Sequence, residues 1–223
     1  METTKKTTTK KKVIDDTAII SLYMNYVLEN NEEPKNLYVF CKVNKVEEVD
    51  FYKFFSSLEG LKQEIWVKFF ENAKSTVEKE EAFETYSDKN KLLTLYFTLF
   101  EVLTLNRSYV VFSLKENKEG LKALKNLKGF RKHFKSYIEE EINSQTTIVS
   151  EQLNKVTKPL YSEGAWIQFL FLLKFWMDDT SKGFEKTDVL IEKSVNTVVD
   201  LLDTKPLESL IDLGKFLWKE KMN

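Results

Sequence analysis

Apolar residues recur along most of the chain at intervals of three and four positions, which places their side chains on one face of an α-helix. The first such face comes from Ile19, Ile20, Tyr23, Met24, Val27 and Leu28. The pattern predicts helices at about 15–30, 36–43, 47–56, 57–79, 89–105, 108–116, 120–141, 162–179 and 187–203, and another after Pro206. Residues 143–158 are polar and weakly patterned, and we expect a loop with a helical turn there.

The residues at the ends of these segments support the assignment. Asp15 or Asp16 can cap the first helix, and Ser57 can cap the long helix that follows it. Pro34 ends the first element. Residues 1–12 alternate Thr and Lys without an apolar anchor, so we predict a disordered basic arm, which either solubilises the chain or contacts phosphates.

Composition agrees with an all-α fold. Only 6 Gly and 3 Pro occur in 223 residues, whereas sheet proteins need turn residues between strands. The 17 Phe exceed what a small helical bundle needs for packing, so some of them could line a cavity.

Charge and cysteine content indicate the cellular setting. The formal net charge is −1 and the pI is about 6.1, so no global basic field captures nucleic acid. Cys41 has no second cysteine to pair with, which fits a reducing compartment. The most apolar run, 165–177, is shorter than the ~20 residues of a membrane span. We therefore expect a cytoplasmic protein without membrane insertion.

Residues that could perform catalysis are scarce. His133 lies in the basic stretch RKHFK, where a surface histidine is the expected role. One His and one Cys cannot build a usual zinc site, and no phosphate-binding glycine loop or nucleophile elbow occurs. Three pairs of adjacent acidic residues are expected to be charges on the solvated surface: Glu47-Glu48, Glu80-Glu81 and Asp178-Asp179. We expect no enzyme, no catalytic residues, no metal and no cofactor.

Three short helices within about 60 residues, with a brief link between the second and third, match a helix-turn-helix unit. The segment from Val46 to Leu61 resembles the recognition helix and the following helix start of TetR-family regulators, at Phe51, Tyr52, Phe55, Ser57, Glu59 and Leu61. The stretches FEVLTLNRSYV and FLLKFWMDDTSKGFEKTD resemble TetR-type C-terminal domains of the Bacteroidetes type. The resemblance implies a helix-turn-helix head at 13–57 and a ligand-binding and dimerisation body at 58–223.

The proposed recognition helix departs from the family pattern. Where the family usually has small and basic residues, this chain has Glu47, Glu48 and Asp50 beside Val49. Carboxylates can accept from cytosine, yet they are repelled by the DNA backbone. The DNA-contacting residues are then expected to be Lys42, Lys45, Tyr52 and Lys53.

In the body, the resemblance implies a pocket for a hydrophobic small molecule or lipid. The residues that would line it are Phe97, Phe100, Leu103, Tyr109, Phe112, Phe134, Trp166, Phe169 and Leu170. The alternative is that these side chains simply fill the core.

Family members dimerise through their last two long helices, and the corresponding segments here are apolar on more than one face. The residues expected at a homodimer interface are Leu172, Trp176, Ile191, Val195, Val198 and Leu202.

Two functions follow from the resemblance. The first is a dimeric transcriptional regulator that binds DNA through its head and is modulated by a hydrophobic ligand in its body. The alternative is a TetR-like protein that binds a lipid or another hydrophobic ligand and no longer binds DNA.

Overall fold

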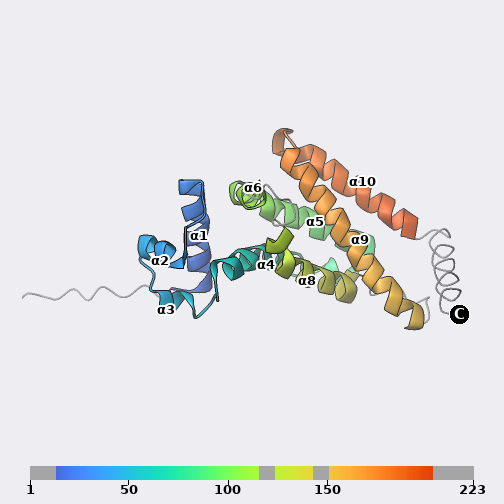
Figure 1. The fold of residues 1–223 in the computed structure, drawn as a ribbon. Helices are drawn as coiled ribbons and strands as arrows, with labels where there is room; N and C mark the ends of the chain where they lie inside the picture. The colour runs from blue at the N-terminus through green and yellow to red at the C-terminus, as the bar shows by residue number, and fades with distance from the viewer. Residues whose placement is uncertain (1–13, 116–123, 143–150, 203–223) are drawn as a thin grey trace, which may run out of the picture. The chain divides into compact units, whose positions relative to one another are not determined.

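A computed structural model describes residues 14–115, 124–142 and 151–202, and these ranges contain helices and no strand (Figure 1). The predicted all-α fold is confirmed. The helices are α1 (Asp16–Asn30), α2 (Leu37–Asn44), α3 (Glu48–Phe51), α4 (Leu58–Val77), α5 (Asp88–Leu105), α6 (Arg107–Lys115), α8 (Lys128–Tyr137), α9 (Glu151–Asp178) and α10 (Glu185–Leu202). Short 3-10 turns η1 (Phe83–Thr85) and η3 (Lys182–Phe184) and a π-helical turn η2 (Ile138–Ile142) complete them. The predicted arm and the helix after Pro206 lie outside the described residues.

The chain divides into two compact units. The first comprises residues 1–65 and 108–126, and the second comprises 66–107 and 127–223. The first unit therefore extends beyond the predicted head of residues 13–57. One reason is visible in the packing, because the ring of Tyr109 contacts that of Tyr23 at 6.4 Å.

In the first unit, side-chain caps begin the helices where the sequence indicates. Asp15 accepts a hydrogen bond from the Ala18 amide at 2.7 Å, and Asn36 accepts one from the Val39 amide at 2.9 Å. The Ser57 hydroxyl accepts from the amide of Gly60 at 3.0 Å, as expected for the start of α4. The predicted capping by Asp15 and Ser57 is confirmed.

Aromatic rings in contact with one another form the core of the head. Phe40 contacts Tyr23 at 5.9 Å and Phe51 at 6.1 Å, and Phe51 contacts Phe55 at 5.6 Å. Lys45 ends α2 in the left-handed region with φ 56°, which turns the chain directly toward α3. Inward-facing aromatics and this tight link give the predicted helix-turn-helix order of elements.

The third helix is much shorter than predicted. Sequence pattern indicated 47–56, but α3 covers only Glu48–Phe51 and the chain continues as a turn. The buried ring of Phe55 is placed by this turn, with its amide bonded to the Phe51 carbonyl at 3.0 Å. The four-residue spacing of Phe51 and Phe55 is therefore compatible with a turn as well as with a longer helix.

The second unit also corrects two segment boundaries. Helix α8 begins at Lys128 and passes into η2, whereas a single helix over 120–141 was predicted; residues 116–123 lie outside the described chain. The predicted loop at 143–158 is wrong for 151–158, because α9 already begins at Glu151 and continues through Pro159. Helix elongation is cooperative and can continue through residues that form no apolar face. The weak apolar pattern of these residues therefore did not indicate the helix.

The turn between α9 and α10 is held by polar contacts on both sides. The Arg107 guanidinium donates to the carbonyls of Trp176 and Met177 at 3.0 and 3.1 Å and lies 4.3 Å from the ring centroids of Trp176 and Phe184. It thereby satisfies carbonyls that the end of α9 leaves open. Phe184 adopts a left-handed φ of 63°, an unusual conformation for a bulky residue.

Asp179 stabilises the same turn from within. Its carboxylate accepts from the amides and hydroxyls of Ser181 and Thr187 at 2.6–3.0 Å. Burial alone would raise the pKa of Asp179, but these four hydrogen bonds outweigh it and hold the pKa well below its usual range.

Among the described helices, none is long and apolar enough to cross a membrane.

Candidate functional site

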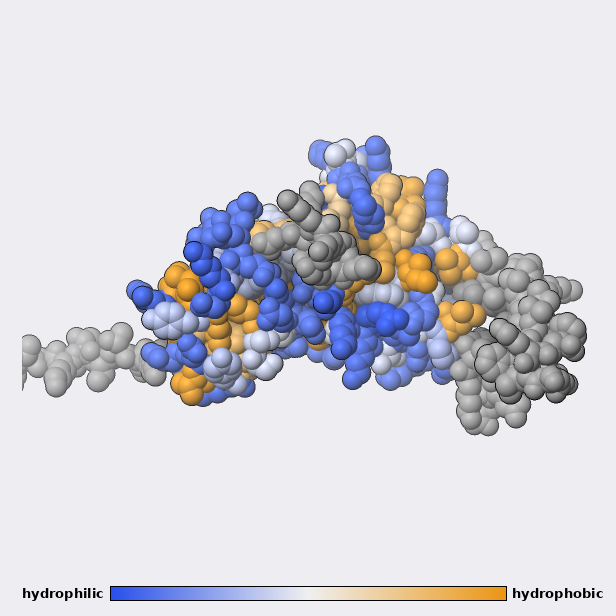
Figure 2. Space-filling model, in the orientation of Figure 1, coloured by the Kyte–Doolittle hydropathy of each residue, from blue (hydrophilic) through white to orange (hydrophobic). Residues whose placement is uncertain are grey.

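The outer surface of α2, α3 and the turn after α3 combines apolar and charged side chains. Tyr38, Val43, Val49, Tyr52 and Phe54 are exposed large hydrophobics, and Figure 2 shows apolar surface over α2 and α3. The four residues predicted to contact DNA, Lys42, Lys45, Tyr52 and Lys53, are exposed as well. The structure therefore places them where a partner could reach them.

Two of these lysines already have partners within the head. The ammonium of Lys53 lies 2.6 Å from the carboxylate of Asp50, and that of Lys42 lies 5.8 Å from the ring centroid of Tyr38. An exposed pair of this kind is weak, so each lysine can still be drawn away by a stronger anion. A competing partner must nevertheless overcome these contacts.

The head carries a negative electrostatic field. Residues 14–57 contain eight carboxylate side chains and four lysines. Burial, and then the charges of Glu48 and Glu47, raise the pKa of Cys41 to about 11. Both glutamates are exposed, so they would face a nucleic acid at the same surface as Tyr52.

The nine residues predicted to line a ligand pocket do not all come together. Phe100, Phe134, Trp166 and Phe169 meet in one cluster, with the rings of Phe134 and Phe169 at 5.9 Å. Leu103 is also buried in the second unit, where Leu170 is half-buried and Phe97 is 39% exposed. Tyr109 and Phe112 belong to the first unit.

The aromatic cluster includes residues that were not predicted to line a pocket. Phe130 lies at its centre, 4.9 Å from Phe169 and 5.3 Å from Trp166. Phe70 and Trp66 of α4 contact Phe130 at 5.5 and 6.2 Å. A recognisable signal was present, since aromatics four positions apart on α4 and on α8 face one another.

Polar atoms inside this cluster differ in how well they are satisfied. Tyr96 stacks on Phe134 and donates its hydroxyl proton to the Ala165 carbonyl at 2.7 Å. The hydroxyl of Tyr137 and the indole nitrogen of Trp66 are buried without a hydrogen-bond partner in the described structure. Such orphaned donors are uncommon in folded proteins.

The six predicted dimer residues are mostly internal. Leu172, Trp176, Ile191 and Val195 are buried within the single chain, Val198 is half-buried, and the side chain of Leu202 lies outside the described residues. The four buried side chains pack their own protomer, which explains their apolar pattern without a second copy.

A different set of apolar side chains is exposed on α9 and α10. Along α9 they recur at spacings of seven, four and four residues, and Figure 2 shows apolar surface over the C-terminal half of this helix. The exposed residues are Leu160, Ile167, Phe171 and Phe175 on α9 and Val189 on α10. Gly164 lies on the same face with open space beside it.

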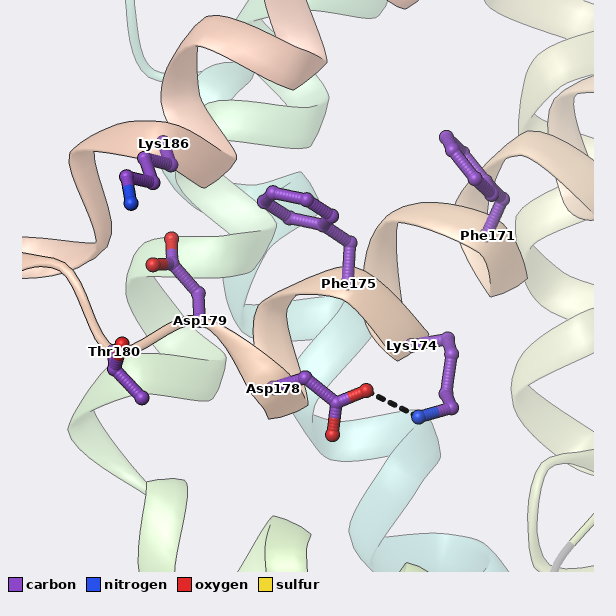
Figure 3. A pocket seen from close by; sticks show the side chains of 7 residues that line it. All are labelled: Phe171, Lys174, Phe175, Asp178, Asp179, Thr180 and Lys186. Carbon is purple, nitrogen blue, oxygen red and sulfur yellow. Dashed lines mark hydrogen bonds and ion pairs between the residues drawn. The ribbon is translucent and has the colours of Figure 1, made fainter.

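A pocket of about 350 Å³ opens at the C-terminal end of this apolar face. Figure 3 shows Phe171 and Phe175 beside Lys174, whose ammonium pairs with Asp178. Asp179, Thr180 and Lys186 complete its lining. None of the nine predicted ligand residues lines this pocket.

The described residues hold no group of three or more His, Cys, Asp or Glu side chains placed to bind a metal ion. His133 is exposed on α8, as the sequence indicated.

Comparison with known proteins identifies the C-terminal part of the chain. Residues 91–217 match the family described as tetracyclin repressor-like, C-terminal domain. A search of curated proteins found no match. The match covers more than half of the chain and includes most of α5 and all of α6, α8, α9 and α10. Of these helices, α5, α8, α9 and α10 belong to the second unit. Regulation, and not catalysis, is the activity to which such a domain points. The chain therefore belongs to the tetracycline repressor-like family of regulators.

Proposed function

We propose that the chain is a dimeric transcriptional regulator whose head binds DNA and whose body binds a hydrophobic ligand. The observation that carries this proposal is the arrangement of α2, the turn at Lys45 and α3. Phe40 and Phe51 face the core of the head, while Val49 of α3 and Tyr52, which directly follows α3, are exposed. Exposed side chains on such an element are the ones that reach base edges in helix-turn-helix proteins. We retain residues 13–57 as the functional head, residues 58–223 as the body and the cytoplasm as the expected location.

Contacts to DNA would be few and weak. Lys45 and Tyr52 are available for phosphates, while Lys42 and Lys53 must first leave Tyr38 and Asp50. Val49 can pack on a thymine methyl group, and Glu48 can accept from cytosine N4. Modest affinity that depends on a few phosphate contacts follows from this surface.

A second copy of this chain would pack against the exposed face of α9 and α10. Isologous pairing places the same residues on both sides, so the apolar face meets itself and its charges must be self-complementary. Lys174 and Asp178 lie beside Phe171 and Phe175 and supply one charge of each sign. Close approach of two α9 helices is easiest at Gly164, where a Cβ would meet no neighbour.

The ligand would bind along the aromatic cluster of α4, α8 and α9. The rings of Trp66, Phe70, Phe130, Phe134 and Trp166 present an apolar surface with few polar groups. Such a lining suits a hydrophobic molecule or a lipid.

The second candidate function is a TetR-like ligand-binding protein that has lost DNA binding. The pairing of Lys53 with Asp50 and the exposed Glu47 and Glu48 favour it, because all three carboxylates oppose a polyanion. Selection of genomic DNA fragments by the purified chain at low salt distinguishes the two functions. The regulator should retain a near-palindromic sequence that the variant Tyr52→Ala retains poorly. Failure of the unmodified chain to enrich any sequence would instead support the second candidate.

A further inference from the structure

The π-helical turn η2 is bordered by two deeply buried hydrogen-bond donors. Tyr137 immediately precedes it at the end of α8 and is 3% exposed. Lys91 of α5 reaches it from another element, is 5% exposed, and donates to the Glu141 carbonyl at 3.4 Å. Isolated π-helical turns occur frequently at functional sites.

The hydroxyl of Tyr137 is a donor without an acceptor. It has no hydrogen-bond partner in the described structure. Burial, and then the carboxylates of Glu78, Glu141 and Glu84, raise the pKa of Tyr137 well above its usual value, so the phenol keeps its proton. A buried donor that makes no bond is unfavourable in the free protein, and an entering acceptor removes that penalty.

Lys91 has donor capacity to spare at the same turn. An ammonium group carries three N–H donors, and the hydrogen bond to Glu141 uses one of them. The ring of Phe83, 5.5 Å from the ammonium, provides a further favourable but non-directional contact. Glu141 lies near both donors, since its carbonyl accepts from Lys91 and its charge acts on the hydroxyl of Tyr137.

Packed aromatic rings continue from this turn along α4 and α8. The ring of Tyr137 contacts Phe70 at 5.9 Å, and Phe70 contacts Phe134 at 5.9 Å and Phe130 at 5.5 Å. A molecule with its oxygen at Tyr137 would therefore lay its apolar part against aromatic rings.

The charges around Tyr137 select against an anion. Glu78, Glu84 and Glu141 lie near enough to influence its hydroxyl, and Lys74, whose ammonium is 5.1 Å from the Tyr137 ring centroid, is itself paired with Glu78 at 3.6 Å. Lys91 alone does not offset these carboxylates. A neutral carbonyl or ether oxygen accepts hydrogen bonds without adding another negative charge.

We propose that Tyr137 and Lys91 form the polar end of a ligand site and hold a neutral oxygen acceptor of an otherwise apolar molecule. This inference rests on the proposed ligand-binding role of the body and names the chemistry of the ligand. Because the neighbouring rings are in contact, the molecule displaces them as it enters between α4 and α8.

Three naphthalene derivatives of similar shape test the proposal on the full chain by isothermal titration calorimetry. They are 2-acetylnaphthalene, which has a carbonyl acceptor, 2-ethylnaphthalene, which has none, and 2-naphthoate, which is an anion. The ketone should bind about tenfold more tightly than the hydrocarbon and more tightly than the carboxylate. Tyr137→Phe and Lys91→Met should each reduce the preference for the ketone to threefold or less.

Tyr96→Phe is the matched control, since its hydroxyl lies in the same cluster but already has an acceptor. It should keep the preference for the ketone and lower the melting temperature, whereas Tyr137→Phe should leave the melting temperature unchanged or raise it. A melting temperature lowered equally by both substitutions would mean that a structural water satisfies Tyr137, and would overturn the proposal. Equal binding of ketone and hydrocarbon would overturn the donor site but leave the hydrophobic ligand of the proposed function. Absence of binding by all three probes up to their solubility limits would overturn both.

Discussion

The surface of the head and the interior of the body differ in whether their hydrogen-bonding side chains have partners. On the head, the exposed Lys53 is paired with Asp50 although water could satisfy it. In the body, the hydroxyl of Tyr137 is buried without a partner although water cannot easily reach it. Pairing on a surface contributes little to stability, whereas a missing partner in the interior is unfavourable.

This contrast indicates in which region a bound partner would add a hydrogen bond without breaking an existing contact. A DNA phosphate approaching the head must replace contacts that the lysines already make. A ligand acceptor approaching η2 would replace nothing at the hydroxyl of Tyr137. With respect to hydrogen-bonding groups, the body is therefore better prepared for its proposed ligand than the head is for DNA, although the ligand must still displace aromatic rings.

The largest effect should come from the cluster that forms the interior of the body. Phe169→Ala removes a fully buried ring that contacts Phe130, Phe134 and Trp166, and should lower the free energy of unfolding by about 4 kcal/mol. Phe97→Ala, at an exposed ring of α5, should lower it by about 1 kcal/mol. Urea denaturation measures both, and equal losses would show that Phe169 is not a core residue of the folded chain.

A smaller effect is expected at the exposed face of α9. Phe171→Asp places a charge on the proposed interface and should weaken dimerisation about 100-fold, because a central apolar contact is lost. Sedimentation equilibrium measures the dissociation constant. Phe97→Asp is the control for an exposed aromatic elsewhere in the second unit and should leave dimerisation unchanged. A monomeric unmodified chain at micromolar concentration would contradict the proposed interface.

The smallest effect concerns the satisfied carboxylate at the α9–α10 turn. The pKa of Asp179 is lowered in the folded chain. Its contribution to the free energy of unfolding is therefore fully present above the pKa of the unfolded chain, about 3.9, and is lost as the pH falls toward the lower pKa of the folded chain. Asp179→Asn should therefore destabilise the chain at pH 7, and the difference should shrink at pH 3. Urea midpoints at the two pH values test this, and an equal difference at both would contradict the hydrogen-bonded, ionised carboxylate.

Much of the fold was predictable because helix periodicity and caps are local properties. Asp15 and Ser57 cap the helices that their sequence context predicts, and the apolar spacing of 89–105 predicts α5 almost to the residue. The start of α9 at Glu151 was missed, because its first residues carry no apolar pattern. Local order extends into such segments by helix propagation, which periodicity does not detect.

The candidate sites depended on contacts that sequence does not display. Phe134 and Phe169 were predicted to line a ligand pocket, and the structure places both in the aromatic cluster. Tyr137 was not predicted, because the sequence does not show which hydroxyls lack a hydrogen-bond partner. Trp176 and Ile191 were assigned to a dimer interface, yet they are buried in the single chain. An apolar helix face shows that something covers it, and only the structure shows whether the cover is the same protomer.

Binding of the selected DNA site by the unmodified chain and by Asp50→Asn tests the account of the head most directly. The substitution removes a negative charge and releases Lys53, so affinity at low salt should rise about tenfold, and the slope of log affinity against log salt should steepen by about two for a dimer. Lys53→Met in the Asp50→Asn background should cancel most of the gain. An affinity that is unchanged or lower in Asp50→Asn would contradict the claim that the paired lysine limits DNA binding by this surface.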